Sequence, residues 1–194
     1  KTRPDLSAPN VQLYFNPVSY TRSSKAKREL MRPDPFPGLL FGFNVCRPTS
    51  RGEITLRSAD PFEAPVIRPN YLSTNEDIAD VLEASHFVRR ISEAPALAAI
   101  IERELSPGTD TRTDEDYLRY IRDNGWTVFH PCSTCRIGKN TNASVVDPRL
   151  RVHGLDGLRV VDASVFPNVT SGNTNAPVIM VAERASDLIL EDFA

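Results

Sequence analysis

Prolines interrupt this chain more often than glycines do, and this limits the folds open to it. The sequence holds 16 prolines against 9 glycines in 194 residues. Because proline removes a backbone donor and disrupts the interior of a helix, such a chain favours turns and extended segments over a bundle of long helices. A fold that mixes strands, loops and a few helices is therefore expected.

The balance of charge and hydropathy is typical of a soluble globular protein. The net charge is −2, from 23 basic and 25 acidic residues, so no nucleic-acid partner is expected. The longest apolar run, Ala176–Ala182, is far below the roughly 20 residues of a membrane span, and no transmembrane segment is predicted. The opening Lys1–Asp5 resembles neither a signal peptide nor a natural start, which suggests a fragment, a processed chain or a separate subunit. Three cysteines permit a reducing compartment, so a cytoplasmic location is expected over secretion.

Residues 1–72 have the patterning of strands and loops. The segments 11–15 and 39–45 are short apolar runs bounded by Pro, Asn and Gly. The segment 53–57 alternates polar and apolar residues, which predicts a half-buried strand. The basic segment Arg22–Arg28, with Lys25 and Lys27, is interpreted as a solvated surface loop.

Three helices are predicted further along the chain. The first begins with the capping box Ser73–Glu76 and ends by Pro95, and residues 96–101 continue the helical region. Its apolar face is formed by Ile78, Val81, Leu82, Ser85, Val88 and Ile91. The second is capped by Thr113 and closed by Asn124–Gly125. The third runs from about Ala176 to Leu190, with Val178, Ala182, Ala185, Leu188 and Ile189 on its buried face.

Between the second and third helices, two strand-like segments form a predicted hairpin. These are 150–152 and 158–161, and the loop between them ends in Asp156–Gly157. The whole pattern is that of an α+β fold.

His130 is the first candidate for chemistry. Pro131 restricts it to an extended backbone, so the imidazole is presented from a rigid, non-helical stretch. Histidine titrates near neutrality and can take a proton from a substrate hydroxyl. Residue type alone also fits a structural histidine.

Cys132 and Cys135 form a CxxC motif, which is the second candidate. A redox pair or half of a zinc site would have this spacing. Zinc needs further ligands, and Cys46 lies far upstream without a partner motif. We interpret the cysteines as structural thiols and predict no metal.

The third candidate is the segment Ser171–Pro177, which leads into the last helix. A helix start exposes unpaired N–H groups and a positive dipole end, and so suits a negative charge. Asn and Thr are also common as plain caps, so capping and binding both remain open on the residues alone.

Taken in order, these segments resemble the glucose-methanol-choline (GMC) oxidoreductase family, in particular its choline-dehydrogenase-like members. The matching residues extend from about Arg47 to the C-terminus, with weaker similarity before it. The motifs that carry the resemblance are Ser50–Leu56, Pro69–Leu72, Phe129–Gly138, Ser144–Gly154, Gly157–Ser164, Ser171–Pro177 and Ala182–Ile189.

The resemblance assigns roles to single positions. It implies that His130 is the general base and that Asn173 is its partner in holding the substrate oxygen. It implies a flavin-binding role for Phe129, Asp162, Ala163, Thr174, Asn175 and Pro177. Hydride would pass from an alcohol carbon to flavin N5, and the last helix would point its N-terminus at the pyrimidine end of the flavin.

The resemblance also implies a division of the chain. Residues 1–125 would form an antiparallel-sheet substrate domain with flanking helices, and 126–194 would carry the active-site segment, strands and helix that complete an FAD-binding domain. The Rossmann GxGxxG that binds the ADP half of FAD does not occur in these 194 residues, so an FAD-binding N-terminal half is expected from the same gene or a separate chain.

We therefore predict the C-terminal part of an FAD-dependent dehydrogenase or oxidase of primary alcohols or aldehyde hydrates. The alternative is a cofactor-free fragment or subunit that acts as a binding module. Substrate, electron acceptor and oligomeric state are not fixed by the sequence.

Overall fold

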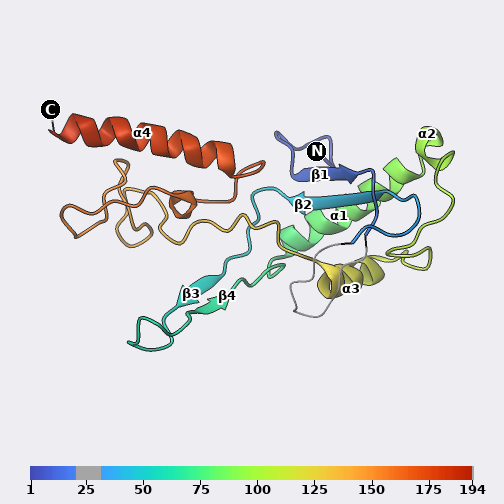
Figure 1. Ribbon diagram of the computed structural model, residues 1–194, viewed down its shortest axis with the longest axis horizontal. Coiled ribbons are helices and arrows are strands. Elements are labelled where there is room, and N and C mark those ends of the chain that lie inside the picture. Colours follow the sequence, from blue (N-terminus) through green and yellow to red (C-terminus); the bar gives the residue numbers. More distant parts are fainter. Residues whose placement is uncertain (21–31, 194) are drawn as a thin grey trace. The chain divides into compact units, whose positions relative to one another are not determined.

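The computed structural model describes residues 1–20 and 32–193, so the predicted basic loop Arg22–Arg28 lies outside the described residues. Helices and small antiparallel sheets are mixed along the chain, as Figure 1 shows, and the predicted α+β class is confirmed.

The chain separates into two compact units, each built from two stretches of sequence. The first consists of 1–45 and 75–127, and the second of 46–74 and 128–194.

A two-stranded sheet begins the first unit. Strand β1 (Val11–Asn16) pairs antiparallel with β2 (Leu40–Val45), in the register Val11↔Val45 to Asn16↔Leu40. Both strands were predicted from their apolar runs. The rings of Phe15 and Phe41 lie opposite each other with centroids 5.3 Å apart, a cross-strand aromatic pair that stabilises the register.

Helix α1 (Asn75–Ser92) follows, and the short α2 (Pro95–Ala98) continues the helical region as predicted. The buried positions of α1 are Asp77, Val81, Ala84 and Ser85. Only Val81 and Ser85 belong to the predicted apolar face. The buried stripe therefore includes an aspartate and a small residue that apolar periodicity alone does not reveal.

Helix α3 (Asp114–Asn124) has the predicted boundaries. The Thr113 hydroxyl accepts from the Asp116 N–H at 3.2 Å, and the Asp116 carboxylate accepts from the Thr113 N–H at 3.1 Å, which completes a capping box. Gly125 closes the helix with its N–H on the Ile121 carbonyl. A Cβ at this position would lie 2.4 Å from that carbonyl oxygen. A residue with a side chain would therefore clash here, and glycine fits.

In the second unit, β3 (Glu53–Thr55) pairs antiparallel with β4 (Val66–Arg68). The predicted strand exists, but the prediction that it is half-buried is wrong. All three residues of β3 are exposed, and Ile54 and its cross-strand neighbour Ile67 are 54% and 63% exposed. A strand with alternating residues is half-buried only where another element covers its apolar face. No described element of this unit covers the apolar face of this hairpin.

The hairpin predicted around Asp156–Gly157 is present, although it forms only isolated bridges. The Val152 N–H donates to the Leu158 carbonyl at 2.9 Å, and the Val160 N–H donates to the Leu150 carbonyl at 3.2 Å. Gly157, which closes the loop, has φ +72, a left-handed conformation that favours glycine.

Helix α4 (Asn175–Phe193) closes the chain and covers the core of the second unit. Val178, Ala185 and Leu188 lie on the buried side as predicted, whereas Ala182 and Ile189 are exposed. The core cluster consists of Val146, Leu150, Val165, Phe166 and Ala185. Among residues 1–20 and 32–193, no helix has both the length and the apolar character of a membrane span.

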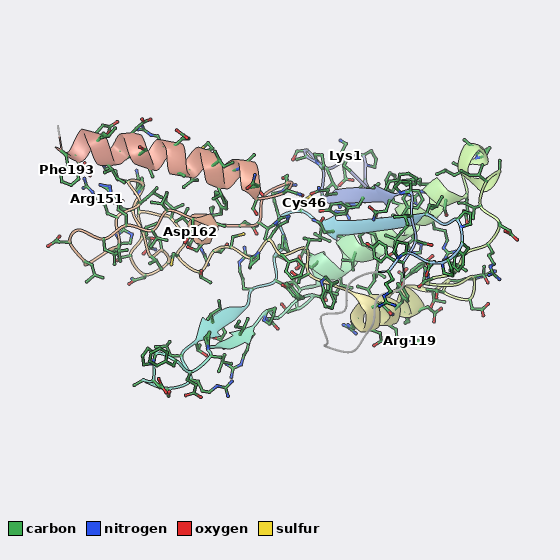
Figure 2. All side chains as sticks on the ribbon, in the orientation of Figure 1. Lys1, Cys46, Arg119, Arg151, Asp162 and Phe193 are labelled. Carbon is green, nitrogen blue, oxygen red and sulfur yellow. The ribbon has the colours of Figure 1, made fainter. Side chains whose placement is uncertain are left out.

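Three arginines hold the last turn of α4. Arg149 donates to Asp192 at 2.8 Å, and Arg151 and Arg159 donate to the other carboxylate oxygen. Figure 2 labels Arg151 beside Phe193 at this end of the helix. The bonds from Arg151, Arg159 and Arg149 hold the pKa of Asp192 far below its usual value.

We expect Asp192→Asn to lower the thermal midpoint of unfolding at neutral pH. The depressed pKa means that the arginine pairing stabilises the folded state above about pH 4, where an unfolded aspartate is ionised. This contribution is lost as the pH falls through the folded-state pKa, so the gap between wild type and variant should narrow below about pH 4. The control is Asp187→Asn, whose side chain is 67% exposed. An equal loss from both substitutions would contradict the assigned role.

We expect Thr113→Ala to lower the unfolding free energy of the first unit by about 1 kcal/mol, because the variant leaves the Asp116 N–H without its cap. Thr113→Ser retains the hydroxyl and should stay within about 0.5 kcal/mol of wild type. Urea unfolding followed by circular dichroism measures both, and equal losses would show that the hydroxyl is not the cause.

Candidate active site at the start of helix α4

The candidate base, His130, is presented by a strained segment of backbone. Phe129, immediately before it, has φ +59, and Ser133 has φ +78. Residues other than glycine rarely adopt this left-handed region, and such conformations concentrate at functional sites. The Phe129 ring is 71% exposed, whereas the imidazole of His130 is half-buried.

The second part of the site is the N-terminus of α4. The Thr174 carbonyl accepts from the Val178 N–H at 2.9 Å, which makes Thr174 the N-cap of the helix. The helix begins Asn175, Ala176, Pro177, so proline occupies the third helical position. Thr174 is only 9% exposed, while Asn175 and Ala176 are exposed.

A hydrogen bond joins the two parts across 44 positions of sequence. The Thr174 hydroxyl lies 3.0 Å from His130 Nδ1. The described residues provide no hydrogen-bond partner for His130 Nε2. One ring nitrogen is therefore held by the protein and the other is available to a ligand.

The remaining predicted site residues fall into two groups. Asn173 is exposed and lies directly before the cap, beside the hydrogen bond from His130 to Thr174. Pro177 is partly buried within the first turn of α4. On the returning segment, the Asp162 carboxylate accepts from the Ser164 N–H at 2.8 Å and caps the 3-10 turn η1 (Ala163–Val165). Ala163 packs against the core of the second unit.

Thr174 as the partner of His130 is the feature that sequence reasoning missed. We predicted a flavin-binding role for this residue, and the partnership predicted for Asn173 concerns the substrate oxygen and stays a prediction. A signal was present, since an N-cap threonine followed by proline at the third helical position has no N3 N–H to accept from.

The loop 46–52 also borders the site and was not predicted to do so. Arg47, with φ +55, donates to the hydroxyl of Ser171, three residues before the cap. A contact across 124 positions has no local signal in the sequence.

The cysteines of the CxxC motif are free thiols. Cys132 packs against the core, and its Sγ lies 3.6 Å from the His130 carbonyl oxygen. Burial raises the pKa of the Cys132 thiol, against smaller opposing effects of Ser133 and Arg51. In the described part of the chain, no group of three or more His, Cys, Asp or Glu residues could hold a metal ion.

The chemistry available here is proton transfer beside a helix N-terminus. An imidazole nitrogen can accept a proton near neutral pH. The first-turn N–H groups of Asn175 and Ala176 have no acceptor within their own helix, and with the helix dipole they favour a negatively charged group.

A protein-family model matches the part of the chain that contains His130 and Thr174. The model of the C-terminal domain described as "GMC oxidoreductase" matches residues 48–182. The alcohol dehydrogenase [acceptor] of Pseudomonas putida is 42% identical over 98% of this chain and 33% of its own length. An oxygen-dependent choline dehydrogenase of Pseudomonas fluorescens is 40% identical over 97% of this chain and 32% of its own length.

Solved structures agree. Pyridoxine 4-oxidase from Mesorbium loti superposes with a TM-score of 0.80 at 32% identity, over 92% of this chain and 34% of that one. A formate oxidase from Aspergillus oryzae, from a study of FAD modification, superposes with a TM-score of 0.82 at 30% identity, over 96% of this chain and 32% of that one. The chain thus spans about a third of the length of the curated relatives it matches.

We expect Cys132 to react slowly with iodoacetamide at neutral pH, because the thiolate is the reactive form and burial raises the thiol pKa. A Cys46→Ser, Cys135→Ser variant isolates this thiol. Its alkylation rate should still rise with pH beyond the ordinary cysteine value of 9.0. The same variant in denaturant is the control, and a folded-state rate that levels off at or below that pH would contradict the assignment.

Proposed function

The chain belongs to the GMC oxidoreductase family, and we propose that it supplies the catalytic base of an FAD-dependent enzyme that oxidises primary alcohols or aldehyde hydrates. The observation that carries the proposal is the half-buried His130, anchored through Nδ1 at the start of α4 with Nε2 open to a ligand. Relatives named as alcohol and choline dehydrogenases support an alcohol as the substrate class.

The residues of this chain fit FAD by their chemistry. The exposed first turn of α4 offers N–H groups and a positive dipole end to the pyrimidine edge of an isoalloxazine ring. The exposed Phe129 ring offers an apolar surface beside His130. We assign flavin contacts to Phe129, Asp162, Ala163, Thr174, Asn175 and Pro177. When bound, the flavin supplies a hydride acceptor at N5.

In the proposed reaction, His130 Nε2 accepts the proton of the substrate hydroxyl. The Asn173 side-chain amide donates to the same oxygen and stabilises the negative charge that develops on it. Loss of the proton to His130 makes departure of hydride from the adjacent carbon easier, because the oxygen then carries the charge needed to form the carbonyl. His130 thus acts on the oxygen.

An FAD-binding N-terminal part completes the proposed enzyme, encoded in the same gene or on a separate chain. Relatives about three times as long as this chain support such a part. In this proposal, residues 1–125 form the substrate domain, and 126–194 return to the FAD-binding domain.

The proposal is tested with His130→Gln in the complete, FAD-loaded protein. We expect anaerobic flavin reduction by alcohol to slow by at least about 100-fold, the usual contribution of a general base, with FAD content unchanged. The matched control is His86→Gln, because His86 lies in the first unit and pairs with Asp114 at 2.7 Å. Reduction at the wild-type rate in His130→Gln would rule out this residue as the base.

A further inference from the structure

We propose that Thr174 is the positioning residue of His130, and that its hydroxyl accepts from Nδ1–H instead of capping its own helix. This inference rests on the proposed function, in which His130 is the base. It concerns the side of the imidazole that faces away from the substrate.

The Thr174 hydroxyl is available because of the residue three positions later. An N-cap threonine ordinarily accepts from the N–H of the second or third helical residue. In α4 that residue is Pro177, which has no N–H. The Thr174 carbonyl still accepts the first intrahelical bond, from Val178, so the cap backbone is in place while its side chain is directed to His130.

Packing fixes the position of this hydroxyl. Thr174 is 9% exposed, and Val178, one turn later, packs against the core cluster. The His130 segment is by contrast strained at Phe129 and only half-buried. The 3.0 Å contact therefore ties the less constrained side chain to the more constrained one.

The direction of the hydrogen bond decides what His130 can do. If Nδ1–H donates to the Thr174 oxygen, the neutral ring carries its lone pair on Nε2, where the substrate proton must arrive. After Nε2 is protonated, the same bond has a charged donor and becomes stronger. Thr174 thus selects the basic tautomer and stabilises the imidazolium. In the described part of the chain, the titratable and charged groups near His130 include the Cys132 thiol, which donates a hydrogen bond to the His130 carbonyl, and Arg51, which acts electrostatically on that thiol.

The test uses Thr174→Val, which keeps the shape without the hydroxyl, and Thr174→Ser, which restores the hydroxyl. In the FAD-loaded protein, we expect Thr174→Val to reduce the rate constant of flavin reduction by about 10- to 100-fold, as expected for a hydrogen bond to a charged group. The apparent dissociation constant of the alcohol should change little.

A second readout is independent of activity. In ¹⁵N-histidine NMR, the His130 signals are assigned by their loss in His130→Gln. Wild type and Thr174→Ser should show the Nδ1–H tautomer, and Thr174→Val a mixture of tautomers. Thermal unfolding confirms that each variant is folded.

Three results are decisive. A Thr174→Val protein with wild-type reduction rate and wild-type histidine spectra overturns the inference. A Thr174→Ser protein as slow as Thr174→Val overturns it as well, because the hydroxyl would then not be the cause. If His130→Gln reduces flavin normally, the proposed function fails, and the NMR spectra still decide whether Thr174 holds Nδ1.

Discussion

The packing of α4 against the segment 132–166 is the interaction on which the second unit depends. That segment forms isolated bridges and turns instead of a sheet, so few backbone ladders hold it. Ala185 of the helix belongs to one buried cluster with Val146 and Val165, and those two residues are the most completely buried large side chains of the described chain. Single backbone hydrogen bonds, such as that from the Ile137 N–H to the Val165 carbonyl at 2.9 Å, cross the segment, and apolar burial against α4 adds to them.

Polar contacts at the two ends of α4 complement this packing. At its C-terminus, the side chain of Asp192 collects bonds from three arginines of the 149–159 region. At its N-terminus, Thr174 contacts His130. The helix is thus fixed along its axis as well as on its face, and a fixed N-terminus is what a site for a developing negative charge requires. The arginine cluster serves the site indirectly, by holding the far end of the same rigid element.

Local features of the sequence predicted most of the elements. Thr113 marked the start of α3, and the spacing of Val178, Ala185 and Leu188 marked the buried side of α4. Exposure was harder to predict, since the alternation at Ile54 describes a strand without saying whether anything covers it. Helix α4 extends to Phe193, beyond the predicted Leu190, where Asp192 meets arginines that lie 33 to 43 positions away. Such long-range pairs have no local signature.

The site shows the same division between local and long-range information. His130 and the loop 171–177 were predicted as candidates, and the family resemblance was confirmed. The hydrogen bond between them was not predicted, because a capping hydroxyl is expected to serve its own helix. It is separate from the prediction that Asn173 helps to hold the substrate oxygen, which stays a prediction. In α4 the hydroxyl cannot bond the third helical residue, because Pro177 has no N–H. A proline at the third helical position therefore leaves the N-cap side chain able to bond a residue outside its own helix. In this chain that residue is His130, the only one of the three histidines that lies at the start of α4.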